Sequence, residues 1–298
     1  AAFSFSLFLP LSLSGCVFLD PLPRFPKVTA QWGEPLITAF DVGYAAKEGS
    51  LLHEEDLQEF RRNDSEFATA FELKREGFVF DCVDLCIDEG WRTCLLGPGG
   101  STSCLMKILA KKLAPTEGTI HHCSGLTIGC CDGGDPTANL EDPNGFLADH
   151  PSATALEYLS DRYPNTTETD LRSHLAAFGL SPASQAKTAL ACLSGGETMR
   201  LVLATISMEN PPVLCLEHPT SHLDVESVRA LAHGLREWNG TLILVCQDAS
   251  FLRSLEEVRC VVIVPEEGKI RRIVDDDQGG TRGMDAYLKT FQDSYVQY

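Results

Sequence analysis

Apolar and polar positions along this chain follow two periods, that of strands and that of helices. Strand-like runs occur at 35–44, 78–88 and 93–97, and two later runs, PPVLCLE and GTLILVC, are apolar throughout. Short, fully apolar runs are typical of buried parallel strands. The segments ATALEYLSDRY, TETDLRSHLAAFG and GGETMRLVLATISM repeat their apolar residues at helical spacing. Strands that alternate with helices predict an α/β domain with a mainly parallel sheet.

The pattern is different before residue 35 and within 47–77. Residues 1–19 carry no charge, and serines alternate with apolar residues around Pro10. This stretch predicts no clear membrane span, and it leaves open a docked extension, a targeting or membrane remnant, or an artificial addition. The Pro-rich segment that follows indicates a linker. Residues 47–77 are polar and predict an amphipathic helix in an insertion. We therefore expect an extension over 1–34 and one domain over 35–298.

The charge balance of the chain narrows the choice of partners. Its 298 residues carry a formal net charge of −18, with a pI near 4.8. Phosphate backbones attract clustered Lys and Arg, so this balance disfavours direct nucleic-acid contact. It favours a protein partner, or a small anion that backbone N–H groups hold.

The 12 cysteines favour a reducing compartment over a disulfide framework, because several lie inside apolar runs. The predicted location is cytoplasmic, with the interior of a mitochondrion or plastid as the alternative. His121, His122 and Cys123, followed by Cys130 and Cys131, form a group that resembles a metal site. Its spacing matches no familiar zinc pattern, so structural zinc is not predicted.

Four segments occur in a fixed order: TCLLGPGGSTSCLMKILAKKL at 93–113, LSGGETMRLVLA at 193–204, VLCLEHPTSHLD at 213–224 and GTLILVCQDASFL at 240–252. They resemble the Walker A, signature, Walker B with D-loop, and switch segments of ABC-type ATPases. PTSHLD is similar to the PTNHLD of the ABC-F branch, whose members are soluble twin-domain proteins that act on ribosomes. The resemblance implies a P-loop core, an antiparallel β portion and a helical signature subdomain over 150–192. It also implies ATP and Mg²⁺ as cofactors.

The resemblance assigns nucleotide binding to a loop and to one aromatic residue. The residues concerned are Gly97, Gly99, Gly100, Ser101, Thr102, Ser103, Cys104 and, at the adenine-stacking position, Tyr44. Tyr44 could equally be an exposed strand-end tyrosine that serves packing.

The Walker A loop lacks the lysine that supplies a cation to the β and γ phosphates. Counting from Gly97, the lysine position holds Ser103; counting back from the following helix, it holds Thr102. The backbone N–H groups from Gly99 onward could still hold an anion. Neither alignment supplies the cation, so weaker nucleotide affinity is expected.

The hydrolytic positions of the family are also changed. Walker B ends in Glu217 and His218 instead of Asp-Glu, and the switch histidine is replaced by Gln247. Gly133 occupies the place of the Q-loop glutamine. Ser103 and Glu217 are the expected weak Mg²⁺ ligands. Loss of a positioned general base alone removes about 10²–10⁴ in rate, so little hydrolysis is expected.

The signature is complete, as is the acid of the D-loop. The signature residues are Leu193, Ser194, Gly195 and Gly196, and the D-loop acid is Asp224. In ABC proteins this helix start contacts the γ-phosphate bound to the opposite domain. The same residues would also persist simply because Ser and Gly start a helix well. Both interpretations stay open.

The sequence therefore predicts a degenerate ABC-F-like protein that acts by binding or scaffolding on a ribosome or similar assembly. One alternative is a slow but active ATPase in translation that uses Glu217 and His218. Another is a regulatory half that pairs through its signature with an active ABC domain.

Overall fold

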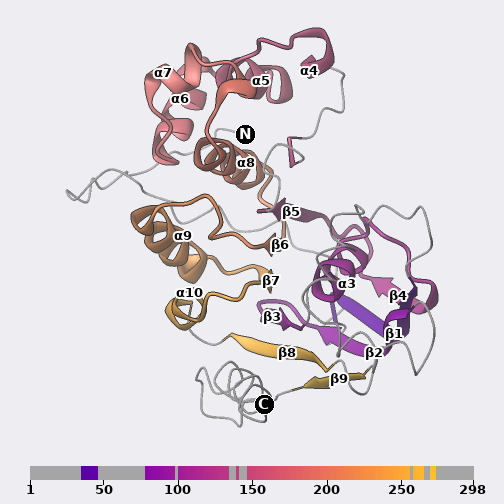
Figure 1. Ribbon diagram of the computed structural model, residues 1–298. Coiled ribbons are helices and arrows are strands. Elements are labelled where there is room, and N and C mark those ends of the chain that lie inside the picture. The colour runs from indigo at the N-terminus through magenta and orange to yellow at the C-terminus, as the bar shows by residue number, and fades with distance from the viewer. Residues whose placement is uncertain are drawn as a thin grey trace. The chain divides into compact units, whose positions relative to one another are not determined.

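The computed structural model describes residues 35–45, 78–97, 100–133, 139–140, 146–255, 258–264 and 269–272 (Figure 1). The extension at 1–34 and the predicted insertion helix within 47–77 lie outside these ranges. The described residues divide into two compact units. The helical unit holds those in 131–210 and 219–238, and the sheet unit holds the others.

Among the residues that the structure describes, the sheet unit contains two sheets and two helices. Its elements are β1 (Ile37–Ala45), β2 (Phe78–Ile87), β3 (Arg92–Leu96), α3 (Ser101–Leu109), β4 (Glu117–His122), β5 (Ile128–Asp132, whose last two residues belong to the helical unit), β6 (Val213–Glu217), β7 (Thr241–Val245), α10 (Ala249–Ser254), β8 (Arg259–Val264) and β9 (Lys269–Arg272).

Strand order confirms the expected arrangement of the sheets. The larger sheet has the order β5-β6-β7-β3-β8-β9, in which β6 with β7, β7 with β3, and β3 with β8 are parallel pairs. The smaller sheet, in the order β2-β1-β4, is antiparallel. The runs VLCLE and TLILV are buried at every position of β6 and β7, which explains why they are apolar throughout.

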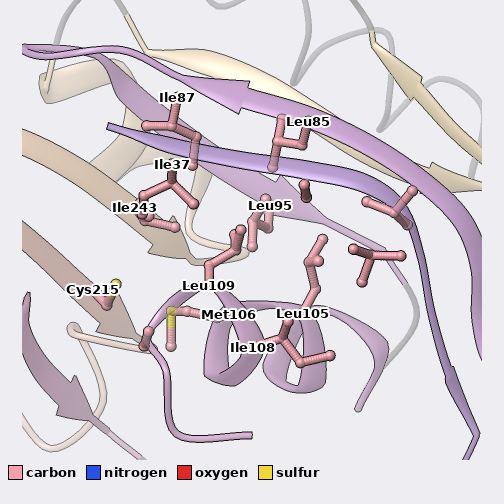
Figure 2. Packing of buried hydrophobic residues seen from close by; sticks show 14 of the residues in the cluster. Ile37, Leu85, Ile87, Leu95, Leu105, Met106, Ile108, Leu109, Cys215 and Ile243 are labelled. Atoms are coloured by element: carbon pink, nitrogen blue, oxygen red, sulfur yellow. The ribbon is translucent and has the colours of Figure 1, made fainter. Parts of the chain in front are cut away.

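The core of the sheet unit lies where α3 meets strands of both sheets. Figure 2 shows Leu105 and Leu109 of α3 directed toward apolar side chains of β1, β2 and β3, and Met106 and Ile108 of the same helix belong to the same buried cluster. Three of these four helix residues are fully buried, and Met106 is nearly so. Each buried side chain of this size contributes about 1.5–3 kcal/mol. This packing holds α3 against the two sheets.

The helical unit contains α4 (Phe146–Asp149), α5 (Ala155–Arg162), α6 (Glu168–Ala177), α7 (Pro182–Ala186), the 3₁₀-helix η2 (Leu190–Cys192), α8 (Gly195–Glu209) and α9 (Val225–Glu237). The three segments with predicted helical spacing form α5, α6 and α8. Helix α5 begins with a capping box between Thr154 and Glu157. Helix α6 is tied to α8 by a contact of 2.9 Å between His174 Nε2 and the carbonyl oxygen of Ala204.

Among the residues that the structure describes, no helix is both long and apolar enough to cross a bilayer.

Candidate functional site

The candidate site in the sheet unit is built from the carboxyl ends of three neighbouring strands. Val245 at the end of β7 pairs with Leu95 of β3 on one side and with Glu217 of β6 on the other. The chain leaving β3 forms the loop into α3, and Gln247 follows β7 by two residues. Ligands of open α/β sheets bind outside such carboxyl ends. The fold therefore gathers the Walker A, Walker B and switch segments at one edge.

Helix α3 directs its N-terminus at this edge. Gly100 precedes the helix with φ of +80°, a left-handed conformation that glycine adopts without strain. No described side chain caps the helix, and its first turn carries no acid. The positive end of the helix dipole is therefore not neutralised by a cap or an acid of the helix itself. Pro98 and Gly99 lie outside the described residues, so the loop is seen only from Gly100 onward.

Walker A and Walker B are joined by a direct hydrogen bond, in which the Ser103 hydroxyl donates to Oε1 of Glu217. Glu217 is 5% exposed at the end of β6, while Ser103 lies in the first turn of α3. A hydroxyl beside a carboxylate presents the oxygen donors that Mg²⁺ prefers. The two residues predicted as Mg²⁺ ligands thus lie together, and their chemistry fits that ion.

His218 has an unusual backbone for a residue with a side chain. Its φ is +45°, and its N–H donates to the carbonyl oxygen of Val245 at 2.8 Å. The imidazole is half-buried, whereas Gln247, across the same edge, is exposed. Left-handed conformations of this kind cost of order 1–3 kcal/mol and persist only where the surrounding structure holds them.

Tyr44 does not match its predicted exposure. It is 5% exposed and belongs to the core cluster, with its ring centroid 6.3 Å from that of Phe80. Period-2 alternation places Tyr44 on the same face of β1 as the buried Val42. The expectation of an exposed strand-end tyrosine is wrong. Adenine stacking by Tyr44 would require its ring to leave the core.

The signature segment begins α8 in the helical unit. Ser194 accepts a hydrogen bond from Glu197 N at 3.3 Å, and the Glu197 carboxylate accepts one from Ser194 N at 3.0 Å. The Glu197 carboxylate also accepts hydrogen bonds from the Ser184 and Ser194 hydroxyls. The hydrogen bond from Ser184, followed by those from Ser194, lowers the pKa of Glu197. An ionised carboxylate therefore lies at the helix start, beside the exposed Ser194 and Gly195.

The D-loop lies directly against the two signature glycines. A Cβ on Gly195 would lie 3.0 Å from Nδ1 of His222, and one on Gly196 would lie 2.7 Å from the carbonyl oxygen of His222. His222 is left-handed, with φ of +64°. Gly196 is therefore needed for this packing, and Gly195 leaves room for the imidazole, apart from any contact with a nucleotide.

Asp224 caps α9 by accepting a hydrogen bond from Ser227 N at 2.7 Å. This hydrogen bond is the largest cause of the lowered pKa of Asp224. Arg200 of α8 reaches both residues, with Nη1 3.9 Å from Oδ2 of Asp224 and 3.3 Å from the Ser227 hydroxyl. The D-loop acid is thus linked to the signature helix within one unit.

The histidine-cysteine group around His121 does not form a metal site. Among the described residues no three His, Cys, Asp or Glu side chains converge as metal ligands. His122 Nε2 instead lies 2.8 Å from the carbonyl oxygen of Leu109, and burial is the main reason that its pKa is lowered. Gly133, at the Q-loop position, is buried.

Sequence reasoning missed the contacts of His222, Arg200 and Glu197. One signal was available: a serine followed three residues later by glutamate, in front of an apolar run, is the pattern of a capping box. The approach of His222 to the glycines had no such signal, because it depends on a loop whose backbone is left-handed at two positions, His218 and His222.

Comparison with known proteins identifies the kind of domain. Residues 80–221 match the family model described as ABC transporter. ABC transporter F family member 4 of Arabidopsis thaliana is 34% identical over 203 residues, which cover 66% of this chain and 27% of that protein. An ATP-binding cassette sub-family F member 3 homolog of Encephalitozoon cuniculi is 32% identical over 86% of this chain and 40% of its own length. The chain thus spans less than half of these relatives.

Solved structures agree on the fold. The dimeric post-hydrolysis state of the ATP-binding cassette MJ0796, bound to ADP and Pi, superposes with a TM-score of 0.56 at 18% identity, covering 81% of this chain and 100% of that one. A second dimeric structure of the MJ0796 cassette gives 0.57 at 19% identity, covering 79% of this chain and 97% of that one. At these identities the likeness concerns the fold alone, and it confirms the expected P-loop architecture. With its ordered motifs and its matches, the chain carries an ABC-type nucleotide-binding domain, and the curated relatives named above are ABC-F proteins.

Proposed function

We propose that this domain acts by binding within an assembly and hydrolyses little ATP on its own. The hydrogen bond between Ser103 and Glu217 carries the proposal. In a working P-loop, the Ser or Thr that follows the lysine binds Mg²⁺ next to the Walker B carboxylate. Ser103, which contacts that carboxylate, therefore takes the Ser/Thr position. The residue before it, Thr102, then takes the lysine position.

A threonine at this position changes how phosphates are held. Thr102 is 4% exposed and supplies a neutral hydroxyl, so no cation from this position faces the β and γ phosphates. The backbone N–H groups at the start of α3 remain as anion donors. When bound, Mg²⁺ would neutralise phosphate charge, and Ser103 and Glu217 are the residues that would hold it. Nucleotide binding is thus weakened but keeps part of its site.

The residues that would handle the attacking water are also altered. His218 takes the place of the glutamate that orients water in the family, and its backbone is fixed by the hydrogen bond to Val245. Gln247 takes the place of the switch histidine with an amide that carries no charge. The slow-ATPase alternative requires the half-buried His218 imidazole to accept the proton by itself.

The partner we propose is a protein surface, on a ribosome or on another ABC domain. The charge of −18 opposes direct contact with phosphate backbones. The relatives extend well beyond the matched segment, so a second cassette in the same assembly is a natural partner.

Binding of a fluorescent ATP analogue to the isolated chain with Mg²⁺, measured beside phosphate release, tests the proposal. We expect weak binding and no turnover above the buffer rate. Micromolar affinity with turnover that disappears in His218→Ala would instead establish the slow ATPase. The matched control is His233→Ala, which removes an exposed histidine from α9 and should change neither quantity.

A second candidate is completion of a partner's site through the signature, favoured by the exposure of Ser194 and Gly195 at the start of α8. The variant Ser194→Asp distinguishes this candidate from a signature whose role is purely structural. Aspartate keeps an accepting oxygen at the helix start, but it loses the hydroxyl that donates to Glu197, and its charge repels both that carboxylate and a phosphate. If the signature completes a partner's site, Ser194→Asp reduces partner-stimulated turnover more than Ser194→Ala does, because the alanine variant removes the same hydroxyl without adding a charge; both variants are assayed at a temperature where they are folded. Unchanged turnover in Ser194→Asp would eliminate this candidate.

A further inference from the structure

A chain of hydrogen bonds in the helical unit leads from an exposed serine to the signature helix α8. The hydroxyl oxygens of Ser181 and Ser184 lie 2.9 Å apart, and the Ser184 hydroxyl also reaches Oε1 of Glu197. The other oxygen of that carboxylate accepts hydrogen bonds from the backbone N–H of Ser194 at 3.0 Å and from its hydroxyl at 2.8 Å. Ser181 is therefore connected to the start of α8, although it lies outside the signature.

The direction of these hydrogen bonds follows from the ionised carboxylate of Glu197. A carboxylate only accepts hydrogen bonds, so the single hydroxyl proton of Ser184 is donated to Glu197. Between the two hydroxyls, Ser181 is therefore the donor and the Ser184 oxygen the acceptor. The hydrogen bond from Ser184 is the largest cause of the lowered pKa of Glu197. Ser184 is 7% exposed, so its polar group depends on these partners and not on bulk water.

Ser181 has the surroundings of a phosphorylation site. Of the 16 prolines in the chain, Pro182 alone follows a serine or a threonine. Proline-directed kinases favour this dipeptide because proline has no N–H that their substrate pocket would leave unpaired. Ser181, Pro182 and Ala183 are all exposed. The backbone of Ser181 has φ of −64° and ψ of 154°, which is the extended conformation in which kinases bind their substrates.

We propose that Ser181 is phosphorylated by a proline-directed kinase and that the phosphate loosens the capping box of the signature helix. The Ser181 oxygen attacks the γ-phosphorus of ATP, the bond from that phosphorus to the β–γ bridging oxygen breaks, and ADP leaves. The serine proton passes to the catalytic base of the kinase. The product is a phosphoserine with a charge of about −1.5 to −2 at pH 7.

The phosphate changes the chain of hydrogen bonds in two ways. Phosphoserine has no hydroxyl proton to donate, and its oxygens compete with Glu197 for the proton of Ser184. The new negative charge also lies across Ser184 from the Glu197 carboxylate, and like charges repel. Glu197 thus loses a hydrogen bond that holds its carboxylate beside Ser194. The proposal does not depend on nucleotide binding by this chain.

The first test incubates the folded chain with ATP and a mitogen-activated protein kinase and locates phosphate by mass spectrometry of its peptides. We expect one phosphate on Ser181 in the wild type and none in Ser181→Ala. A synthetic peptide that spans residues 177–187 is the control for kinase activity. Phosphate on this peptide but not on Ser181 of the folded chain would overturn the proposal.

Hydrogen exchange measures the effect on the signature helix. In the phosphorylated chain, peptides that cover residues 194–199 should exchange their amide hydrogens several times faster than in the unmodified chain. Peptides from α9, which begins with the separate cap Asp224, should not change and serve as the internal control. Unaltered exchange at 194–199 in a chain that is fully phosphorylated on Ser181 would contradict the proposed effect.

The variant Glu197→Gln tests whether the effect passes through the carboxylate. Glutamine keeps an accepting oxygen for the capping box but carries no charge. A phosphate at the start of α7 also interacts with that helix, and this contribution is the same in both proteins. Phosphorylation should therefore shift the melting temperature of the wild type downward by about 2–4 °C relative to the shift in Glu197→Gln. An equal shift in both proteins would refute the connection through Glu197.

Discussion

The imidazole of His222 lies over Gly195, so that a Cβ on this glycine would be 3.0 Å from Nδ1 of the ring. The carbonyl oxygen of the same histidine lies 2.7 Å from the place of a Cβ on Gly196. The signature and the D-loop of one chain are thus packed against each other. The two glycines have a structural reason to be present that does not depend on a nucleotide.

Gly196→Ala is expected to destabilise the helical unit by about 1–3 kcal/mol, because its Cβ meets backbone, which cannot swing away. Gly195→Ala meets a side chain and should cost less. His222→Gly removes that ring and suits a positive φ, so it should rescue Gly195→Ala but not Gly196→Ala. Urea unfolding of the three single variants and the two double variants measures this. Equal stability of Gly196→Ala and the wild type would contradict the packing described.

The capping box at the start of α8 predicts a stability effect of Ser194 that is separate from any partner. Ser194→Ala removes the acceptor of the Glu197 N–H and should lower the free energy of unfolding by about 1 kcal/mol. Ser194→Thr keeps both the accepting oxygen and the hydroxyl that donates to Glu197, and should stay close to the wild type. A thermal melt that ranks the alanine variant above the threonine variant would exclude this function for the serine.

His174 makes the stability of the helical unit depend on pH. Burial is the main cause that lowers its pKa, which favours the neutral ring whose Nε2 contacts the Ala204 carbonyl. A lowered pKa means that the unfolded chain binds the proton more readily, so this stability is full above the ordinary histidine pKa.

Stability should therefore fall as the pH drops from about 7 to about 5, through that ordinary value and toward the lower folded one. His174→Gln keeps a donor near the same carbonyl but cannot be protonated. The fall in the urea midpoint should be smaller in this variant, with the remainder attributable to other groups such as His122. An identical pH profile in both proteins would refute the assignment.

Burial of Tyr44 predicts that its main contribution is to the core. Tyr44→Ala should cost about 3–5 kcal/mol, as truncation of a buried aromatic does. Tyr44→Phe keeps the ring and should change both stability and nucleotide affinity little. Denaturant unfolding measures the stability, and titration with the ATP analogue measures the nucleotide affinity. A stable Tyr44→Ala with weakened ATP binding would restore adenine stacking.

Much of the fold could be predicted because local sequence patterns determine its strands and helix starts. Fully apolar runs became β6 and β7, and Thr154 and Ser194 began helices through capping boxes. The burial of Tyr44 was not predicted, since an aromatic at a strand end has the same local pattern whether it is exposed or buried. Its burial depends on Phe80, which lies on another strand.

The sequence predicted which residues belong to the candidate site but not how they contact one another. The sequence left two positions for the missing lysine, because the loop is one residue short and can be counted from either end. The hydrogen bond between residues 103 and 217 bridges a long stretch of chain and no local rule contains it.

The central claim concerns Thr102, and returning a lysine to this position tests it most directly. A charge-assisted hydrogen bond to phosphate is worth about 1.5–3 kcal/mol, so Thr102→Lys should tighten Mg·ATP binding by about ten- to a hundredfold. Ser103→Lys, the same change one residue later, removes the hydroxyl that meets Glu217 and should not tighten binding. Titration of the labelled analogue into both variants measures the change in affinity. We predict tighter binding in Thr102→Lys alone. Tighter binding in Ser103→Lys alone would contradict the assignment of Thr102 to the lysine position.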